Sequence, residues 1–151
     1  MRRSLEPLKK RVLSCLEAGA MATSCTMTHD WIEPFYADMI DNETISTLYS
    51  ANATRVGRSL MEPDNESKVV GSTDMGNVSY IVPSIHPMIG VAPPGVPIHT
   101  PDFAHFSRSE SGDKAVIDGA KIMAMTVVDL WAQKTNFERA HQEFQQAFET
   151  N

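Results

Sequence analysis

Apolar positions recur along the chain with two different periods, and these periods predict its elements. Between residues 5 and 22 they recur every three or four residues, which is the spacing of one helix face. The positions on this face are Leu5, Leu8, Val12, Cys15, Gly19 and Ala22. From residue 23 to residue 30 apolar and polar residues alternate, which is typical of a strand. The pattern therefore predicts a helix over 5–22 followed by an edge strand over 23–30.

Three further helices follow from cap and periodicity signals. Asp41 and Asn42 can cap a helix that ends at Gly57. Asp113 can cap a helix that runs to about Trp131, and its apolar residues cover most of the helix circumference. We therefore expect that helix to be mostly buried against a sheet. A capping box at Thr135 predicts a last helix with a narrow apolar stripe, which would dock at the periphery.

Short apolar runs near residues 68–71, 80–82 and 87–91 predict a small sheet under the helices. The expected fold class is therefore α/β. A crossing segment with Pro34 and three aromatic residues separates the first helix and strand from the rest. We place a domain boundary there, which gives residues 1–36 and residues 37–151. The first unit is too short to bury a core of its own, so it needs additional chain or a partner.

Composition narrows the classes of function. The chain has 151 residues, of which 42% are hydrophobic and 21% are charged, as in ordinary globular proteins. The formal net charge of −6 argues against a nucleic-acid groove. No apolar run reaches 18 residues, so no membrane span is expected. The beginning lacks the apolar core of a signal peptide, and the two cysteines fit no disulfide framework, so a cytoplasmic setting is expected.

Candidate chemistry concentrates between Gly71 and Phe103. A turn of small and hydroxyl residues ends in Asp74, and Gly76-Asn77 permits positive φ or a close backbone approach. Asp74 can be a metal carboxylate, a general base, or a residue that fixes the turn; we favour the last. A loop with four prolines then carries His99. Because proline fixes φ, this loop is a stiff support on which an imidazole could bind zinc, although a hydrogen bond to a backbone carbonyl is the simpler interpretation.

The other histidines have plainer interpretations. His86 has apolar neighbours, so a core or cleft-wall position is favoured over metal binding. His105 lies six residues beyond His99, which is not a helical ligand spacing, and His141 is expected on the surface. The chain contains no phosphate loop, nucleophile elbow or His-Glu-x-x-His helix, so nucleophilic catalysis by serine or cysteine has no support.

Several of these residues carry a family resemblance. The motifs are Gly71-Ser72-Thr73-Asp74-Met75-Gly76-Asn77-Val78-Ser79, Val82-Pro83, Ile85-His86-Pro87 and His99-Thr100-Pro101-Asp102-Phe103-Ala104. They resemble the C-terminal part of peptidase family M-twenty, the dinuclear-zinc amidohydrolases that include aminoacylases, aminobenzoyl-glutamate hydrolases and dipeptidases. The resemblance extends from about Arg2 to about Trp131. A whole family member is two to three times longer, so the chain resembles a C-terminal fragment.

The resemblance implies a fold and an activity. Residues 1–36 would be the last helix and strand of an α+β lid or dimerisation domain, and residues 37–151 the C-terminal part of a zinc-exopeptidase-type catalytic domain. The reaction implied is metal-dependent hydrolysis of the amide bond of a dipeptide or N-acyl amino acid. Two zinc ions, with manganese or cobalt as alternatives, would serve as cofactors in a homodimeric protein. In that protein the His99 loop and the Asp74 turn would face one pocket.

The resemblance also assigns residues. His99 would bind one metal, and the substrate cleft would be bordered by Gly71, Ser72, Thr73, Asp74, Asn77 and His86. The general base in this family is a glutamate upstream of anything in this chain, so no catalytic residue is assigned here. An alternative is that the chain as given is an inactive, truncated product that acts as a partner-binding or dimerisation module.

Overall fold

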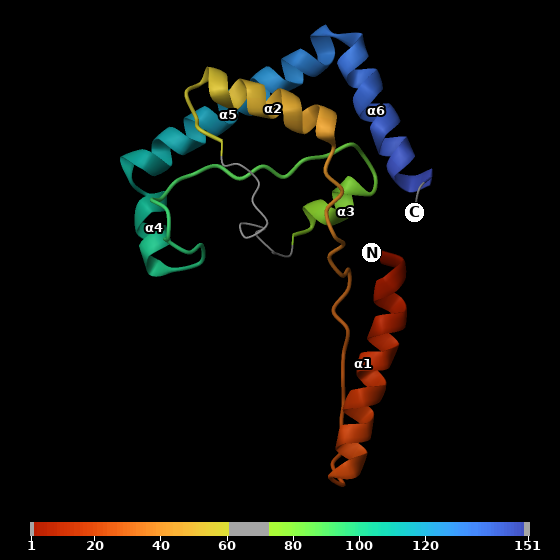
Figure 1. Ribbon diagram of the computed structural model, residues 1–151. Coiled ribbons are helices and arrows are strands. Elements are labelled where there is room, and N and C mark those ends of the chain that lie inside the picture. Colours follow the sequence, from red (N-terminus) through yellow and green to blue (C-terminus); the bar gives the residue numbers. More distant parts are fainter. Residues whose placement is uncertain (1, 61–72, 150–151) are drawn as a thin grey trace.

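A computed structural model describes residues 2–60 and 73–149, and six helices form within these ranges (Figure 1). The predicted helix over residues 5–22 is confirmed. The helices are α1 (Arg2–Ala22), α2 (Glu43–Arg55), α3 (Met75–Ser79), α4 (Pro101–Ser107), α5 (Glu110–Ala132) and α6 (Lys134–Glu149).

The body of the molecule consists of α2, α5 and α6, which contact one another, together with α4, which contacts α5. Its apolar centre is small. Tyr49 and Ala53 of α2 meet Ile122 of α5, and Val56, Ile85 and Ile89 pack around them. Several polar side chains are buried beside this cluster, among them Asn52 with no exposed surface. The body is therefore held by polar contacts as much as by apolar ones.

The predicted ends of α2 are confirmed. The Asn42 side chain accepts a hydrogen bond from the Ile45 backbone N–H at 3.1 Å, which is an N-cap. Gly57 stops the helix with φ of +80°, a conformation that glycine adopts at little cost. The Arg58 N–H then bonds to the Ala53 carbonyl at 2.9 Å, which closes the last turn.

The other two predicted starts are wrong by a few residues. Helix α5 begins at Glu110, because the Ser109 hydroxyl, and not Asp113, caps it by accepting from the Gly112 N–H. Helix α6 begins at Lys134, so Thr135 lies inside the helix. A single residue, Gln133, separates α5 from α6, and this leaves no room for a capping box at Thr135.

The predicted strands at 23–30, 80–82 and 87–91 are wrong, and the predicted strand at 68–71 lies outside the described residues. Residues 80–82 instead close the turn after α3, where the Ile81 N–H bonds to the Val78 carbonyl at 2.9 Å. The only β-type pairing in the described ranges is an isolated parallel bridge between Asp41 and Ser84. A strand needs a neighbour that takes up its N–H and C=O groups, and residues 2–60 and 73–149 provide no such neighbour for these segments. The described fold is mostly helical and agrees only loosely with the α/β prediction.

Residues 2–36 form an arm. Helix α1 contacts no other helix of the described chain, and the segment after it returns along its side before entering the body (Figure 1). The predicted apolar face of α1 remains open, since Leu5, Leu8 and Val12 are all exposed. The Lys9 ammonium lies 4.1 Å from the centre of the Trp31 ring, which links helix and returning segment. Within the described residues, no helix combines the length and apolar content needed to cross a bilayer.

Helix α5 is the clearest departure from expectation. Its predicted burial is wrong for the large apolar residues: Val116, Val128 and Trp131 are exposed. The side that faces the body instead carries one large apolar residue, Ile122, among small and polar ones, which are Gly112, Ala115, Asp118 and Thr126. The helix therefore packs against α2 with its less apolar side.

Candidate functional site

The predicted cleft turn forms a joint between the arm and the body. Of its residues, Gly71 and Ser72 lie outside the described ranges. Thr73 accepts a hydrogen bond from the Met75 N–H through its hydroxyl at 3.3 Å. Asp74 is exposed and occupies the N-cap position of α3 without a capping hydrogen bond from its side chain. Thr73 therefore orders the turn locally, and the Asp74 carboxylate stays open to solvent.

Asn77 holds the joint together. Its side-chain oxygen accepts from the Ala37 N–H at 2.7 Å, and its Nδ2 donates to the Phe35 carbonyl at 3.2 Å. The amide thus pairs with the backbone as a neighbouring strand would. Beside it Gly76 lies so close that a Cβ atom would stand 1.9 Å from the Ala37 carbonyl oxygen. The close approach expected at Gly76-Asn77 is confirmed; the role of Asn77 toward a substrate stays a prediction.

Two further contacts extend the joint along the crossing segment. The buried Ser79 hydroxyl accepts from the Ile40 N–H at 3.0 Å and donates to the Gly76 carbonyl at 2.6 Å. The Tyr80 hydroxyl bonds to the Asp38 carboxylate at 3.0 Å. Together these contacts fix residues 35–40 against α3 by hydrogen bonds.

His99 is presented on a short support. It is exposed, and its φ of +62° is the left-handed conformation that non-glycine residues seldom adopt. The next residue, Thr100, caps α4 by accepting from the Phe103 N–H at 3.2 Å and also donates to the Pro97 carbonyl at 2.8 Å. Thr100 therefore fixes the end of the proline loop. No described residue forms a hydrogen bond with the His99 ring.

The described chain does not bring His99 beside the Asp74 turn. His99 adjoins α4 and Asp74 adjoins α3, and these helices do not contact each other (Figure 1). His86 lies between them in sequence and is exposed. Across residues 2–60 and 73–149, no three side chains of histidine, cysteine, aspartate or glutamate are grouped as metal ligands. Within this part of the chain, the imidazole of His99 is at most one ligand of a metal site.

A buried ion pair fixes the beginning of the proline loop, and the sequence did not reveal it. Asp118 accepts from Lys114 Nζ at 2.6 Å and from Arg58 Nε at 2.8 Å. Arg58 Nη1 also donates to the Gly90 carbonyl at 3.0 Å, and the Ser111 hydroxyl to the Val91 carbonyl at 2.6 Å. The end of α2 and the start of α5 thus hold the segment that leads to His99. The i, i+4 spacing of Lys114 and Asp118 was visible in the sequence, but the partner 60 residues away was not.

These contacts set the charge state of Asp118. The hydrogen bond from Lys114 lowers the pKa of the carboxyl most, burial opposes it, and Arg58 lowers the pKa further, with a net decrease below the ordinary value. Asp118 is therefore ionised at neutral pH, as a partner of two cations should be.

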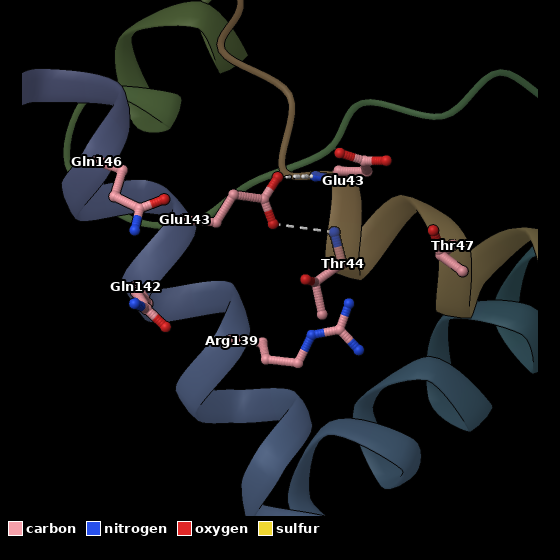
Figure 2. A pocket seen from close by; sticks show the side chains of 7 residues that line it. All are labelled: Glu43, Thr44, Thr47, Arg139, Gln142, Glu143 and Gln146. Carbon is pink, nitrogen blue, oxygen red and sulfur yellow. Dashed lines mark hydrogen bonds between the residues drawn. The ribbon is translucent and has the colours of Figure 1, made fainter. Parts of the chain in front are cut away.

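A polar cleft of about 340 Å³ lies between the beginning of α2 and α6 (Figure 2). It is lined by Glu43, Thr44, Thr47, Arg139, Gln142, Glu143 and Gln146. The Glu143 carboxylate accepts from the backbone N–H groups of Glu43 and Thr44, the latter at 3.0 Å. The Asn42 side chain donates to the Ala140 carbonyl at 2.9 Å. The Glu143 carboxylate of α6 therefore already pairs with the positive N-terminal end of the α2 dipole. An anion in the cleft would find these two N–H groups occupied.

Comparison with known proteins identifies two long relatives. The chain is 32% identical over 146 residues to an Xaa-Arg dipeptidase of Mus musculus, and 27% identical over 143 residues to an Xaa-Arg dipeptidase of Homo sapiens. Each alignment covers 94% of this chain but 33% of the relative. The chain thus spans about a third of the length of the curated relatives it matches. No protein-family model matches it.

Proposed function

We propose that this chain is the C-terminal part of a metal-dependent dipeptidase that hydrolyses the amide bond of a dipeptide or N-acyl amino acid. The observation that carries the proposal is the 32% identity to an Xaa-Arg dipeptidase, which extends over 94% of this chain. Similarity over nearly the whole chain is stronger support than one short motif. Dipeptides with a C-terminal arginine are therefore the first substrates to assay.

His99 is the residue that we assign to the metal. Its ring fits this role in two respects: it is exposed, and the described chain engages neither of its nitrogens. Zinc binds neutral imidazole, and a ligand on a fixed loop binds with less loss of conformational freedom. A pair of zinc ions, or of manganese or cobalt ions, would polarise the substrate carbonyl and lower the pKa of a bound water.

The remaining contributions of the chain are structural. The turn at Asp74 and Asn77 would border the substrate cleft, and Arg58 and Ser111 would hold the loop that carries His99. The other metal ligands and the general base would come from the two thirds of the dipeptidase that this chain does not match. A homodimeric, cytoplasmic protein is the expected setting.

A second candidate function is that of a partner-binding module without catalytic activity. The open apolar faces of α1 and α5 favour it, because each leaves large apolar side chains in solvent. The two candidates differ in one respect: the first requires His99 for turnover, and the second does not.

A chimera separates the two candidates. In it, this chain replaces the matched third of the mouse Xaa-Arg dipeptidase, and hydrolysis of Xaa-Arg dipeptides is measured with zinc present. We expect activity in the chimera and a loss of at least about a hundredfold in His99→Ala, since ligand loss weakens the metal site. His105→Ala is the matched control, because His105 is also exposed and lies in α4.

The purified chain alone provides a second test. We expect it to bind zinc weakly, to lose that binding in His99→Ala but not in His105→Ala, and to hydrolyse no dipeptide. A folded chimera in which His99→Ala retains full activity would rule out the proposed role of His99. Dipeptide hydrolysis by the isolated chain would contradict the assignment of the missing groups to the unmatched two thirds.

A further inference from the structure

Helix α5 has its apolar side turned outward. From residue 116 to residue 131, one exposed side of the helix consists only of apolar residues, and we call it the α5 stripe. Its members are Val116, Ile117, Ala120, Met123, Ala124, Val127, Val128 and Trp131. At about 100° per residue they cover an arc of about 140° with no polar residue between them. At 1.5 Å per residue the stripe is about 22 Å long.

The exposure within the stripe is large. Val116 is 70% exposed, Val128 60% and Trp131 78%. The opposite side of the same helix faces the body, and there Asp118 and Thr126 are buried together with Gly112, Ala115 and Ile122. A helix in a stable protein normally buries its apolar side and leaves its polar side in water. Here both sides are suited to burial, so α5 is built to lie between two layers.

The described chain supplies only one of these layers. α2 and α6 cover the side with Asp118, and none of the described helices covers the stripe over its whole length. A contiguous apolar surface of this kind marks an interface in a soluble protein. In each relative, the chain outside the matched third is about twice as long as the matched part. This additional chain is long enough to provide the second layer.

We propose that the α5 stripe is the docking surface for the polypeptide that corresponds to the unmatched two thirds of the dipeptidases. This inference rests on the proposed kinship with those enzymes. The occupant presents an apolar face to the stripe. Ala120 and Ala124 lie near the middle of the arc, between larger side chains, so the occupant can approach the helix closely there.

A second copy of this chain is the other conceivable occupant. It would place two identical stripes against each other. In the relatives, the matched third and the additional chain belong to one polypeptide, so docking between them needs no association of separate molecules. For that reason we assign the stripe to the unmatched two thirds.

Binding can be measured at the stripe itself. The chain has two tryptophans, and Trp131 lies in the stripe. In a Trp31→Phe background the emission of the chain reports the environment of Trp131. The probe is the unmatched two thirds of the mouse dipeptidase, prepared as a separate polypeptide with its own tryptophans replaced by phenylalanine. We expect a one-to-one complex and a blue shift of the Trp131 emission as the indole leaves water.

A matched pair of variants tests the site. Val128→Lys places a charge in the stripe at an exposed position, so the isolated chain should still fold. It should weaken binding by more than about tenfold, because a charge would be buried without a partner. Ile32→Lys is the control, since Ile32 is 89% exposed and lies in the arm. It should bind as the unaltered chain does.

Each outcome decides the proposal. Equal binding by Val128→Lys and Ile32→Lys, or no binding with both polypeptides folded by circular dichroism, overturns it. A dimer of this chain that Val128→Lys dissociates assigns the stripe to a second copy and also overturns it. Hydrolysis of Xaa-Arg dipeptides by the complex is measured separately. Docking without hydrolysis supports the stripe and counts against the proposed activity.

Discussion

The body and the arm are held by different kinds of contact. In the body, buried side chains far apart in sequence bond to one another: Asn52 of α2 reaches Asp129 of α5 at 2.8 Å, and Arg58 reaches Asp118. In the arm, the hydrogen bonds join residues close in sequence, and the Lys9 ammonium lies over the half-exposed Trp31 ring. The joint at Asn77 connects the two. A substitution in the arm should therefore leave the stability of the body unchanged. Removal of one buried side-chain amide in the body should lower the stability of the whole body.

The largest effect is expected for Asn52→Ala. Asn52 has no exposed surface, and its Nδ2 donates to Asp129 Oδ2 at 2.8 Å and to Thr126 Oγ1 at 3.3 Å. Its loss removes a donor from the buried Thr126 hydroxyl and from the part-buried Asp129 carboxylate and leaves a cavity, so the free energy of unfolding should fall by about 2–4 kcal/mol. Urea unfolding followed by circular dichroism measures this. Ser46→Ala, exposed on the same helix, should change the value by less than about 0.5 kcal/mol. Equal stability of the two variants would contradict the importance of the buried contacts.

The joint should respond next. Asn77→Ala removes two hydrogen bonds to the crossing segment and should cost about 1–3 kcal/mol, with the effect concentrated in residues 35–40. Hydrogen exchange of the Ala37 amide should accelerate more than exchange of amides within α5. Asn77→Asp keeps the acceptor for the Ala37 N–H and should lose less protection there. Val78→Ala, beside it and partly exposed, serves as the control. Unchanged exchange at Ala37 in Asn77→Ala would show that the joint is held by something else.

Acid should weaken the body through Asp118. Since the pKa of this carboxyl is lowered in the folded chain, folding favours the ionised form. The stabilisation is complete above the ordinary value of 3.8 and is lost as the pH falls through the lower pKa of the folded state. Unfolding is measured from about pH 6 downward in steps of about 0.5 pH unit. The free energy of unfolding should fall less steeply with decreasing pH in Asp118→Asn than in the unaltered chain. Asp113→Asn, exposed on the same helix, should keep the slope of the unaltered chain.

The smallest effect is expected in the arm. Lys9→Ala removes a partly exposed cation from the Trp31 ring and should reduce the free energy of unfolding by less than about 1 kcal/mol. The emission of Trp31, recorded in a Trp131→Phe background, should change, while the unfolding midpoint of the body should not. Lys10→Ala alters a neighbouring exposed lysine and should change neither. A shift of the body midpoint in Lys9→Ala would mean that arm and body unfold as one unit.

Local signals in the sequence predicted both ends of α2. The cap at Asn42 and the stop at Gly57 depend on residues within one or two turns, and both are where the sequence placed them. The strands at 80–82 and 87–91 were wrong because an apolar run becomes a strand only when another strand lies beside it. That condition depends on chain elsewhere in the fold, which a short window of sequence does not contain.

The candidate site divides in the same way. The close approach at Gly76 could be anticipated, since glycine before asparagine indicates it, but its partner Ala37 is 39 residues away. The bond from Glu143 to the start of α2 and the pair between Arg58 and Asp118 left no signal in the sequence. The outward side of α5 was predicted as buried from its composition alone. In the described chain it is exposed, because composition indicates that a surface needs cover but not which segment provides it.

The joint also determines where the chain can change over evolutionary time. The side chains of Asn77 and Ser79 bond to the main-chain N–H groups of Ala37 and Ile40, and every residue except proline carries the N–H group that these two bonds require. Positions 37 and 40 should therefore accept many residue types in a saturation library and reject proline. Positions 76, 77 and 79 should accept few, because there the side chain, or its absence, forms the contact.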